Sequence, residues 1–316
     1  MAGSLSKIDF SRLKAERQLA KLVEPHAKAR KFFNLVRENR ELRALWELSN
    51  YMALSKLKFS DHGPIHGFVT ARNAIIMLNI LKEKGVETDL LKDRRADFDD
   101  VLVVLLGAGL FHDVGNAVHR EEHWLTGPIL LEDALQEELE KIYDREKAML
   151  MRVMMFSCIY SHESIKQKLT VEASLIGLAD YTDMTRGRAV GIFEQGKVNI
   201  HTVSSEAIER VLIVPGEKKP IRIMVELNNS SGIFHVEEFL MKNLMSGVLK
   251  NQVEVIAQVA PMSRKTEKRI IQCINLMEQW DLEKKFGVGV RFRFAIFYGL
   301  SDNSGVSCYF IILSYA

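Results

Sequence analysis

The order of apolar and polar positions divides the chain into a helical first part and a second part that contains strands. Leucine, phenylalanine and tryptophan recur at helical spacing over Arg12–Met52, with an interruption near Pro25. Pro64 stands where a first helical turn would begin, and an apolar face continues over Ala71–Lys84 up to Gly85. The pattern therefore predicts helices on both sides of residue 60.

A long apolar run marks the centre of this helical part. Asp97–Asp113 is almost entirely apolar in its middle, which predicts a buried central helix. Gly115 follows, and we expect it to end the helix in the left-handed conformation. Further amphipathic helices are predicted at Trp124–Asp144, Arg145–Tyr160 and Val171–Thr185.

The apolar period changes around residues 195–205. Two β-branched runs, Ile208–Val214 and Ile221–Leu227, are joined by a turn-rich segment and predict a pair of strands. Asn228–Gly232 then opens a helix whose apolar face carries Ile233, Val236, Leu240, Leu244 and Val248. The remaining predicted elements are a strand at Val253–Val259, a helix at Lys265–Trp280, and strands at Val290–Ile296 and Val306–Leu313.

These elements predict an α+β protein with two domains. Residues 1–195 form an N-terminal all-α domain, and residues 196–316 form a smaller C-terminal α/β sandwich in the order ββαβαββ. The C-terminal domain carries few chemically informative residues. Dimerisation, regulation and substrate recognition stay open as its role, and a homodimer is one possibility.

Composition narrows the choice of partners and compartment. The 316 residues include 27% charged residues and 47% apolar ones, with a net charge of +2, which does not favour nucleic acid or an anionic membrane as partner. Three widely spaced cysteines do not suggest a disulfide framework. The apolar run Val101–Phe111 is about half as long as a membrane-spanning helix. We therefore expect a cytoplasmic protein without a membrane segment.

Histidines and aspartates gather around the end of the apolar run. His112 and Asp113 close it, and two more histidines follow within ten residues. Imidazole and carboxylate are ligands for divalent cations, and a buried helix is otherwise a poor place for them. The sequence therefore predicts a metal site, for which the candidate residues are His62, His66, His112, Asp113, His119, His123, His162 and Asp180.

The His112-Asp113 doublet also suggests how two ions could be held. Neighbouring side chains can converge on one ion only if the backbone bends at the helix end. A carboxylate has two oxygens and can bridge two cations, roughly 3.5–4 Å apart in two-metal phosphoryl-transfer sites. Manganese, magnesium, iron and zinc all accept this mixture of nitrogen and oxygen ligands.

The order of these residues resembles a known superfamily. A histidine (His66), the His112-Asp113 doublet and a later aspartate (Asp180) are the hallmark of HD-domain phosphohydrolases. His123-Trp-Leu-Thr-Gly-Pro-Ile-Leu, Ser161-His162-Glu163 and Leu178-Ala-Asp-Tyr-Thr-Asp183 are similar to motifs of the bacterial HD-GYP branch. The resemblance covers about residues 55–190.

The chain departs from the HD-GYP pattern at three places. No Gly-Tyr-Pro follows Glu163, so specificity for cyclic di-GMP does not carry over. Asn116 stands where a lysine or histidine often follows the doublet, so a phosphate contact there would be uncharged. His62 replaces a glutamate that some trinuclear members use. The resemblance therefore implies two metal ions.

The resemblance implies an HD-type helical domain and hydrolysis of a phosphate ester, either a nucleotide or a phosphodiester. A metal-activated bridging hydroxide would attack phosphorus, and Asp113 would orient it. Arg186 and Arg188, which follow Asp180, are candidates for phosphate contacts together with Asn116, and His119 is a candidate general acid. The implied metal ligands are His66, His112, Asp113, His123, His162 and Asp180.

Two other functions stay open for the same residues. A di-iron centre with these ligands could activate dioxygen, as in a minority of HD proteins. A non-catalytic protein could instead bind a nucleotide in the helical domain and relay the signal through the C-terminal domain. Intact candidate ligands favour hydrolysis, because a degenerate sensor would often have lost one.

Overall fold

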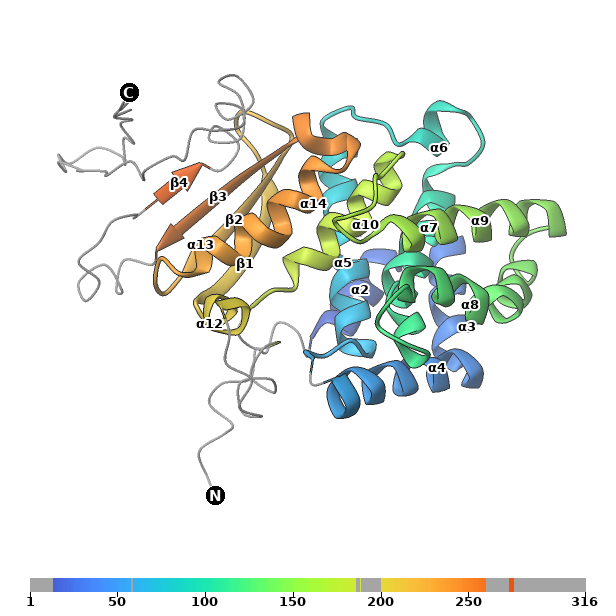
Figure 1. Ribbon diagram of the computed structural model, residues 1–316. Helices are drawn as coiled ribbons and strands as arrows, with labels where there is room; N and C mark the ends of the chain where they lie inside the picture. Colours follow the sequence, from blue (N-terminus) through green and yellow to red (C-terminus); the bar gives the residue numbers. More distant parts are fainter. Residues whose placement is uncertain (1–13, 58, 186–187, 189–199, 260–272, 276–316) are drawn as a thin grey trace.

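The computed structural model describes residues 14–57, 59–185, 188, 200–259 and 273–275. Helices form the larger part of the molecule, and a small sheet with its own helices lies at one side (Figure 1). The mixture of helices and strands expected from the sequence is confirmed. The predicted domain boundary at 195/196 lies outside the described residues.

The first helices follow the predicted pattern with one additional break. The predicted interruption at Pro25 separates α2 (Ala15–Val23) from α3 (Ala27–Glu38), and Asn39 separates α3 from α4 (Arg40–Tyr51). The Asn39 side chain accepts hydrogen bonds from the first free backbone amides of α4, which is how asparagine caps a helix. A short π-helix, η2 (Met52–Leu57), continues α4.

The central helices agree with the prediction. Pro64 begins α5 (Pro64–Glu83), a short α6 (Asp89–Lys92) follows, and α7 (Phe98–Phe111) begins at a capping box made by Asp97 and Asp100. Most of α7 is buried, as its uninterrupted apolar run indicates.

Two glycines let α5 and α7 approach closely. A Cβ on Gly67 would lie 2.6 Å from the Leu110 carbonyl oxygen, and one on Gly109 would lie 2.7 Å from the Ala71 Cα. Only hydrogen fits at both points. The close approach matters because His66 and His112 lie next to these contacts.

Gly115 does not adopt the left-handed conformation that was predicted for it. Among the described glycines only Gly85 has a positive φ. The chain leaves α7 through a 3-10 turn, η3 (Val114–Ala117), and Gly115 packs against the start of α8. A Cβ at Gly115 would lie 2.0 Å from the His123 carbonyl oxygen, so glycine is needed for proximity and not for its backbone angles.

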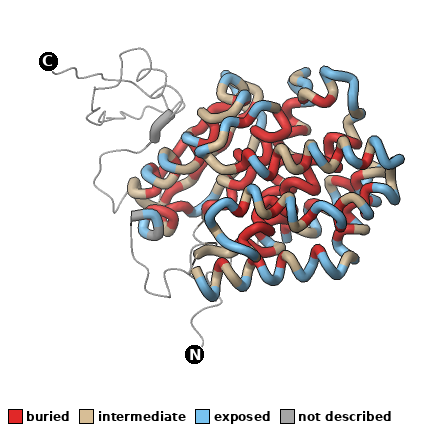
Figure 2. The backbone as a smooth tube through the Cα atoms, turned by 45° about the vertical axis from the view of Figure 1, so that its right-hand side comes forward, coloured by how far each residue is buried: buried red, intermediate tan, exposed pale blue. Residues whose placement is uncertain are grey.

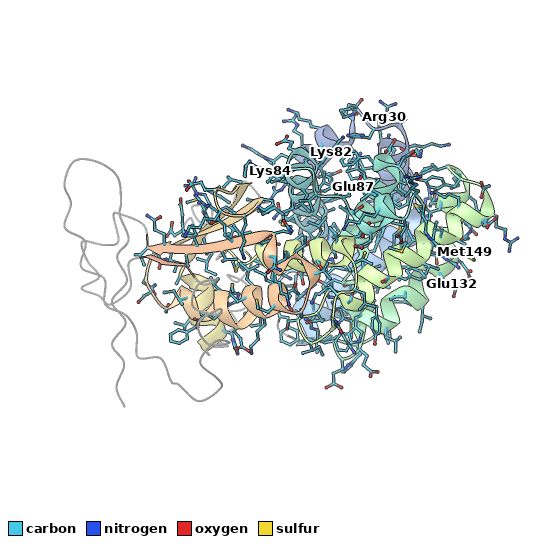
Figure 3. All side chains as sticks on the ribbon, turned by 90° about the horizontal axis from the view of Figure 1, so that it is seen from above. Arg30, Lys82, Lys84, Glu87, Glu132 and Met149 are labelled. Carbon is cyan, nitrogen blue, oxygen red and sulfur yellow. The ribbon has the colours of Figure 1, made fainter. Side chains whose placement is uncertain are left out.

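The remaining helices of the first part are α8 (His123–Glu140), α9 (Arg145–Ser161) and α10 (Val171–Thr182), close to their predicted bounds. Figure 2 shows buried backbone through the interior and exposed backbone on the outer helical turns. Figure 3 shows Arg30, Lys82 and Glu132 projecting outward from the helical part. Within the described ranges, no helix combines the length and apolar character needed to cross a bilayer.

Among the described residues, the sheet contains four strands in the order β1-β2-β3-β4. β1 (Ile208–Pro215) pairs antiparallel with β2 (Ile221–Leu227), and β2 pairs in parallel with β3 (Val253–Val259). The parallel pair requires a crossover, which covers one face of the sheet (Figure 1). A short helix, α12 (Ile200–Glu206), precedes β1. The crossover between β2 and β3 consists of α13 (Gly232–His235), η4 (Val236–Met241), α14 (Lys242–Met245) and η5 (Val248–Asn251).

Two predictions in the C-terminal part are wrong. A helix was expected over Lys265–Trp280, but β4 (Cys273–Asn275) lies inside that range, because pairing with β3 overrides the local helical pattern. Val248 was expected on the buried helix face and is 47% exposed, because the helix ends at Met245. The predicted strands Val290–Ile296 and Val306–Leu313 lie outside the described residues.

The helical part and the sheet share one hydrophobic core. A single cluster of buried apolar side chains runs from the helices into the inward face of β2 and the crossover. Side-chain contacts between α10 and the crossover include Tyr181 with Phe239, whose ring centroids lie 6.0 Å apart. The sheet is therefore packed directly against the helices that carry the candidate metal ligands.

Candidate metal centre

The candidate metal ligands come together at the ends of five helices. His66 lies in the first turn of α5, His112 and Asp113 follow α7, and the others begin or end α8, α9 and α10. All of them are buried, and overlapping groups of them could hold metal ions. The side chains that meet are the six implied ligands His66, His112, Asp113, His123, His162 and Asp180, together with His62.

Each of the four histidines turns its Nε2 atom toward the cluster and uses its Nδ1 atom in a hydrogen bond. Its Nδ1 faces an oxygen acceptor: Asp183 Oδ2 for His66 (2.8 Å), Gly109 O for His112 (3.0 Å), Arg120 O for His123 (2.9 Å) and Ile159 O for His162 (2.6 Å). Because these oxygens can only accept, each Nδ1 carries the hydrogen. In a neutral ring the Nε2 atom is then an acceptor.

These Nε2 atoms face one another in pairs. The Nε2 atoms of His66 and His112 lie 3.0 Å apart, and those of His123 and His162 lie 3.1 Å apart. Two lone pairs at this distance repel unless a proton or a metal cation lies between them. A cation would also match the way metal-bound histidines are held, since their second nitrogen commonly donates to a carbonyl or carboxylate. The donor set therefore fits metal ions.

The first set of ligand atoms surrounds the His66–His112 pair. Asp180 Oδ1 lies 3.0 Å from His66 Nε2 and 3.6 Å from His112 Nε2, and Asp113 Oδ2 lies 3.4 and 3.2 Å from the same atoms. Ligand atoms bound to one cation at about 2.1 Å and separated by 90–110° lie roughly 3.0–3.4 Å from one another. The observed spacing is close to that of a shared coordination sphere.

The second set surrounds the His123–His162 pair. Asp113 Oδ1 lies 3.3 Å from His123 Nε2, on the opposite side of the carboxylate from the first set. Glu163 Oε1 lies 3.5 Å from the same nitrogen. The two oxygens of Asp113 therefore face different ligand sets, which is the arrangement that a bridging carboxylate requires.

Helix α4 and the 3-10 turn fix the position of the doublet. Trp46 Nε1 donates to the Leu110 carbonyl (2.7 Å), and Ser49 Oγ donates to the Asp113 carbonyl (2.8 Å), so α4 is hydrogen-bonded to the end of α7 and to the turn that follows it. Asn116 Nδ2 donates to both the carbonyl (2.9 Å) and Oδ1 (3.0 Å) of Asp113. The carboxylate is therefore held in one orientation.

Charges in the metal-free cluster shift the pKa values strongly. Burial alone would raise the pKa of Asp113, but the positive charges of His62 and His112 hold it well below its ordinary value. Burial would lower the pKa of His112, yet the charges of Asp113 and Asp180 raise it to about 10. Without a metal ion, a proton on His112 therefore occupies the place where a cation would be favoured.

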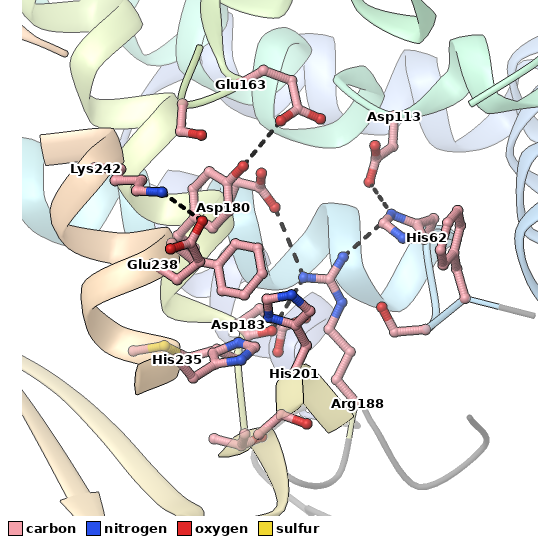
Figure 4. Close-up of a pocket in the computed structure, with 18 of the residues that line it drawn as sticks. His62, Asp113, Glu163, Asp180, Asp183, Arg188, His201, His235, Glu238 and Lys242 are labelled. Atoms are coloured by element: carbon pink, nitrogen blue, oxygen red, sulfur yellow. Dashed lines mark hydrogen bonds and ion pairs between the residues drawn. The ribbon is translucent and has the colours of Figure 1, made fainter. Parts of the chain in front are cut away.

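Two arginines line the cluster, and one of them was not predicted. Arg188 Nη2 lies 3.1 Å from His66 Nε2, and its Nε donates to the Asp61 carbonyl (3.1 Å). Arg120 Nη1 lies 3.2 Å from His123 Nε2, and Nη2 pairs with Glu163 Oε1 (2.9 Å). Figure 4 shows Arg188 between His62 and Asp183. Arg120 lies three residues before His123, a spacing that could have indicated it.

The other predicted site residues have different outcomes. Asn116 donates to the Asp113 carboxylate and does not line the cleft. It therefore contacts a candidate metal ligand and not the space where a substrate would lie. His119 is exposed and away from the cleft, and its Nδ1 accepts from the Glu121 amide (3.1 Å). Arg186 lies outside the described residues. His62 Nδ1 lies 2.6 Å from Asp113 Oδ2, within the cluster.

Contacts with the crossover helices support the second ligand set. Asn243 Nδ2 donates to the His162 carbonyl (2.7 Å), and both residues are buried. Lys168 Nζ donates to the Glu163 carbonyl (2.7 Å) and to Ser246 Oγ (2.8 Å). The loop that carries His162 and Glu163 is therefore tied to α14 and the turn that follows it.

A cleft with a volume of about 490 Å³ opens beside the cluster. Asp113, Asp180, Arg120 and Arg188 are among the residues that line it, and α12 and the crossover helices contribute others. Figure 4 shows Asp113, Asp180 and Arg188 in this lining. The candidate metal centre is therefore accessible to a small molecule. Side chains from the sheet-bearing part that line the cleft are His201, Ser205, His235, Glu238, Phe239 and Lys242.

The fold and site together define a helical protein with a buried histidine–aspartate cluster that could hold metal ions. The chain is 38% identical over 252 residues to an uncharacterized protein of Methanocaldococcus jannaschii, MJ1020, and the aligned region covers 80% of this chain and 94% of that protein. The chain belongs to the same family as this archaeal protein. No protein-family model matches the chain, and no solved structure matches it significantly.

Proposed function

We propose that this protein is a metal-dependent phosphohydrolase of the HD-domain type, which binds two divalent cations and cleaves a phosphate ester. The observation that carries the proposal is the pair of facing Nε2 contacts, at 3.0 and 3.1 Å, joined by the two oxygens of Asp113. The motif order that resembles HD phosphohydrolases supports the same reading. Manganese, magnesium, iron and zinc all suit these ligands.

When bound, two cations would supply an activated water and offset the charge on the phosphoryl oxygens. The protein's own contribution is to fix the ligands and to hold the substrate. Asp113 is oriented by Asn116, and His66 is oriented by Asp183. These hydrogen bonds with Asn116 and Asp183 determine which nitrogen and oxygen atoms face the cleft.

Arg120 and Arg188 would position the phosphoryl group. Both line the cleft, and guanidinium groups bind phosphate oxygens through paired N–H donors. In the metal-free protein these arginines lie beside the ring nitrogens of His123 and His66. With metal present on those nitrogens, the guanidinium groups would be available to the substrate. Phosphoryl transfer is mostly positioning and electrostatics, so little further acid catalysis is required.

The test is a turnover screen of purified protein loaded with manganese, magnesium, iron or zinc. Generic phosphomonoesters, phosphodiesters and nucleotides are supplied, and released phosphate or alcohol is measured. We expect metal-dependent hydrolysis of at least one class, abolished by a chelator. Metal binding without hydrolysis of any phosphate ester would contradict the proposal.

Two rival functions predict different results for the purified protein. A di-iron oxygenase would contain iron and act only when oxygen is supplied. A nucleotide sensor would bind nucleotide without consuming it. No geometric feature of the described residues favours either rival over hydrolysis.

A further inference from the structure

The crossover helices present two different faces. Val236, Leu240 and Leu244 are buried against the sheet and the helices. His235, Phe239 and Lys242 follow the spacing i, i+4, i+7, and all three line the cleft instead. The sheet-bearing part therefore contributes a wall to the site as well as a core.

An aromatic group occupies this wall. The Phe239 ring lies 4.6 Å from the His235 ring, 5.3 Å from the His201 ring and 6.0 Å from the Tyr181 ring, measured between centroids. Phe239 and Tyr181 are nearly parallel, with an interplanar angle of 16°. We call these four residues the ring group.

The ring group is not explained by core packing. Phe239 is only half-buried, whereas its helix neighbours Val236 and Leu240 are completely buried. His201 is exposed on the open side of the cleft. Figure 4 shows His201 and His235 close to Arg188 and at the opposite end of the cleft from Glu163.

The ring group adjoins the candidate metal ligands. Tyr181 directly follows Asp180, and its hydroxyl donates to Glu163 Oε2 (3.0 Å). Glu163 Oε1 in turn accepts from Arg120 Nη2 (2.9 Å). A molecule whose phosphoryl group lies at the arginines would therefore place its next atoms beside these rings.

The size and polarity of the cleft indicate a larger substrate than phosphate alone. About 490 Å³ is in the range of pockets that enclose drug-sized ligands. Within the described part of the chain, His235 Nδ1 is buried without a hydrogen-bond partner. It is thus available to a polar atom at the edge of a heteroaromatic ring.

We propose that the ring group is a subsite for a planar aromatic group, so that the substrate is a phosphate ester of an aryl alcohol or of a nucleoside. This inference rests on the proposed phosphohydrolase function for its phosphate site. It assigns to the C-terminal part the selection of the substrate's organic portion. Aromatic rings prefer offset or edge-to-face contacts with other rings, which a saturated ring of the same size cannot make.

The test compares two phosphonates that cannot be hydrolysed, 2-phenylethylphosphonate and 2-cyclohexylethylphosphonate. Their affinities for the manganese-loaded protein are measured by titration calorimetry, so no turnover is needed. We expect the phenyl compound to bind about fivefold more tightly. A 5′-phosphonate analogue of adenosine forms the third arm, and tighter binding than the phenyl compound would identify a nucleoside rather than an aryl group.

Variants locate the preference. Phe239→Leu should remove the advantage of the phenyl compound while leaving the cyclohexyl affinity nearly unchanged. The matched control is Phe234→Leu, because Phe234 lies on the same segment but is 51% exposed and does not line the cleft. Its ligand preference should equal that of the wild type.

The outcomes separate this inference from the function on which it rests. Equal affinities of the two phosphonates for the wild-type protein, or a preference that survives Phe239→Leu, would overturn the ring group as a subsite and leave the phosphohydrolase proposal standing. If neither phosphonate binds to protein that retains manganese, the phosphate site itself is wrong, and the aromatic subsite falls with it.

Discussion

The two candidate ligand sets share Asp113 but differ in how the fold holds them. The first set is carried by α5, α7 and α10, which pack together in the core with glycine contacts at Gly67 and Gly109. The second set is carried by the start of α8 and the loop after α9, and it depends on Gly115 and Asn243. Metal binding at the first set, which is held by packed helices, and at the second set, which is held partly by a loop, should therefore respond differently to substitutions away from the ligands.

The largest effect is expected from the residue that the two sets share. Asp113→Ala removes one ligand from each set, so metal content should fall from about two ions to near zero, and hydrolysis should fall by at least about 10²–10³-fold. Elemental analysis and the turnover assay measure both. Asp133→Ala, at an exposed position on α8, is the control. A variant that retains full activity would contradict the bridging role.

Gly115→Ala should separate the two sets. The added Cβ would lie 2.0 Å from the His123 carbonyl oxygen, so the start of α8 must shift while α5, α7 and α10 keep their contacts. We expect one metal ion to remain and hydrolysis to be lost. Gly127→Ala is the matched control, because its Cβ would meet nothing closer than 3.4 Å. Retention of both ions in Gly115→Ala would show that His123 is not held in this way.

Asn243→Leu tests the support from the crossover helices with a smaller effect. The substitution removes the hydrogen bond to the His162 carbonyl (2.7 Å). It should weaken the affinity for the second metal ion by about tenfold, as is typical when a residue that supports a metal ligand is changed. Titration of metal-free protein with manganese measures this affinity. Leu244→Ala is the control: it costs folding stability through lost packing but should leave manganese affinity unchanged.

The smallest expected effect is the release of a proton from His112 when metal binds. In the metal-free protein the pKa of His112 is raised to about 10, so the folded protein holds this proton at pH 8 and the unfolded chain does not. The contribution of this proton to the free energy of unfolding is complete below pH 6.5 and is lost as the pH rises through about 10. Metal binding at pH 8 should therefore release about one proton, which calorimetry in two buffers of different ionisation enthalpy detects. No proton release would contradict the raised pKa.

The sequence alone could predict much of this arrangement. Helical spacing gave the helices, and the order from His66 to Asp180 indicated side chains that the structure does place together. Their role as metal ligands stays a prediction. The strand pair β1 and β2 was also evident as Ile208–Val214 and Ile221–Leu227, because β-branched runs flank a turn-rich segment.

Contacts between distant segments could not be predicted in the same way. Asn243 is 81 positions from His162, and no local pattern connects them. Gly115 was recognised as necessary, but its close neighbour is visible only once α8 is in place. The ring group also combines segments that are far apart, since Tyr181 belongs to α10 and Phe239 to the crossover.

The most direct test of the central claim is the metal content of the protein. Purified chain is freed of metal with a chelator, reloaded with manganese, separated from free ions and analysed for manganese per chain. The proposed function predicts two tightly bound ions in the wild type. Protein that stays folded but retains no metal under any loading condition would contradict the account, because facing Nε2 atoms would then be held together by protons alone.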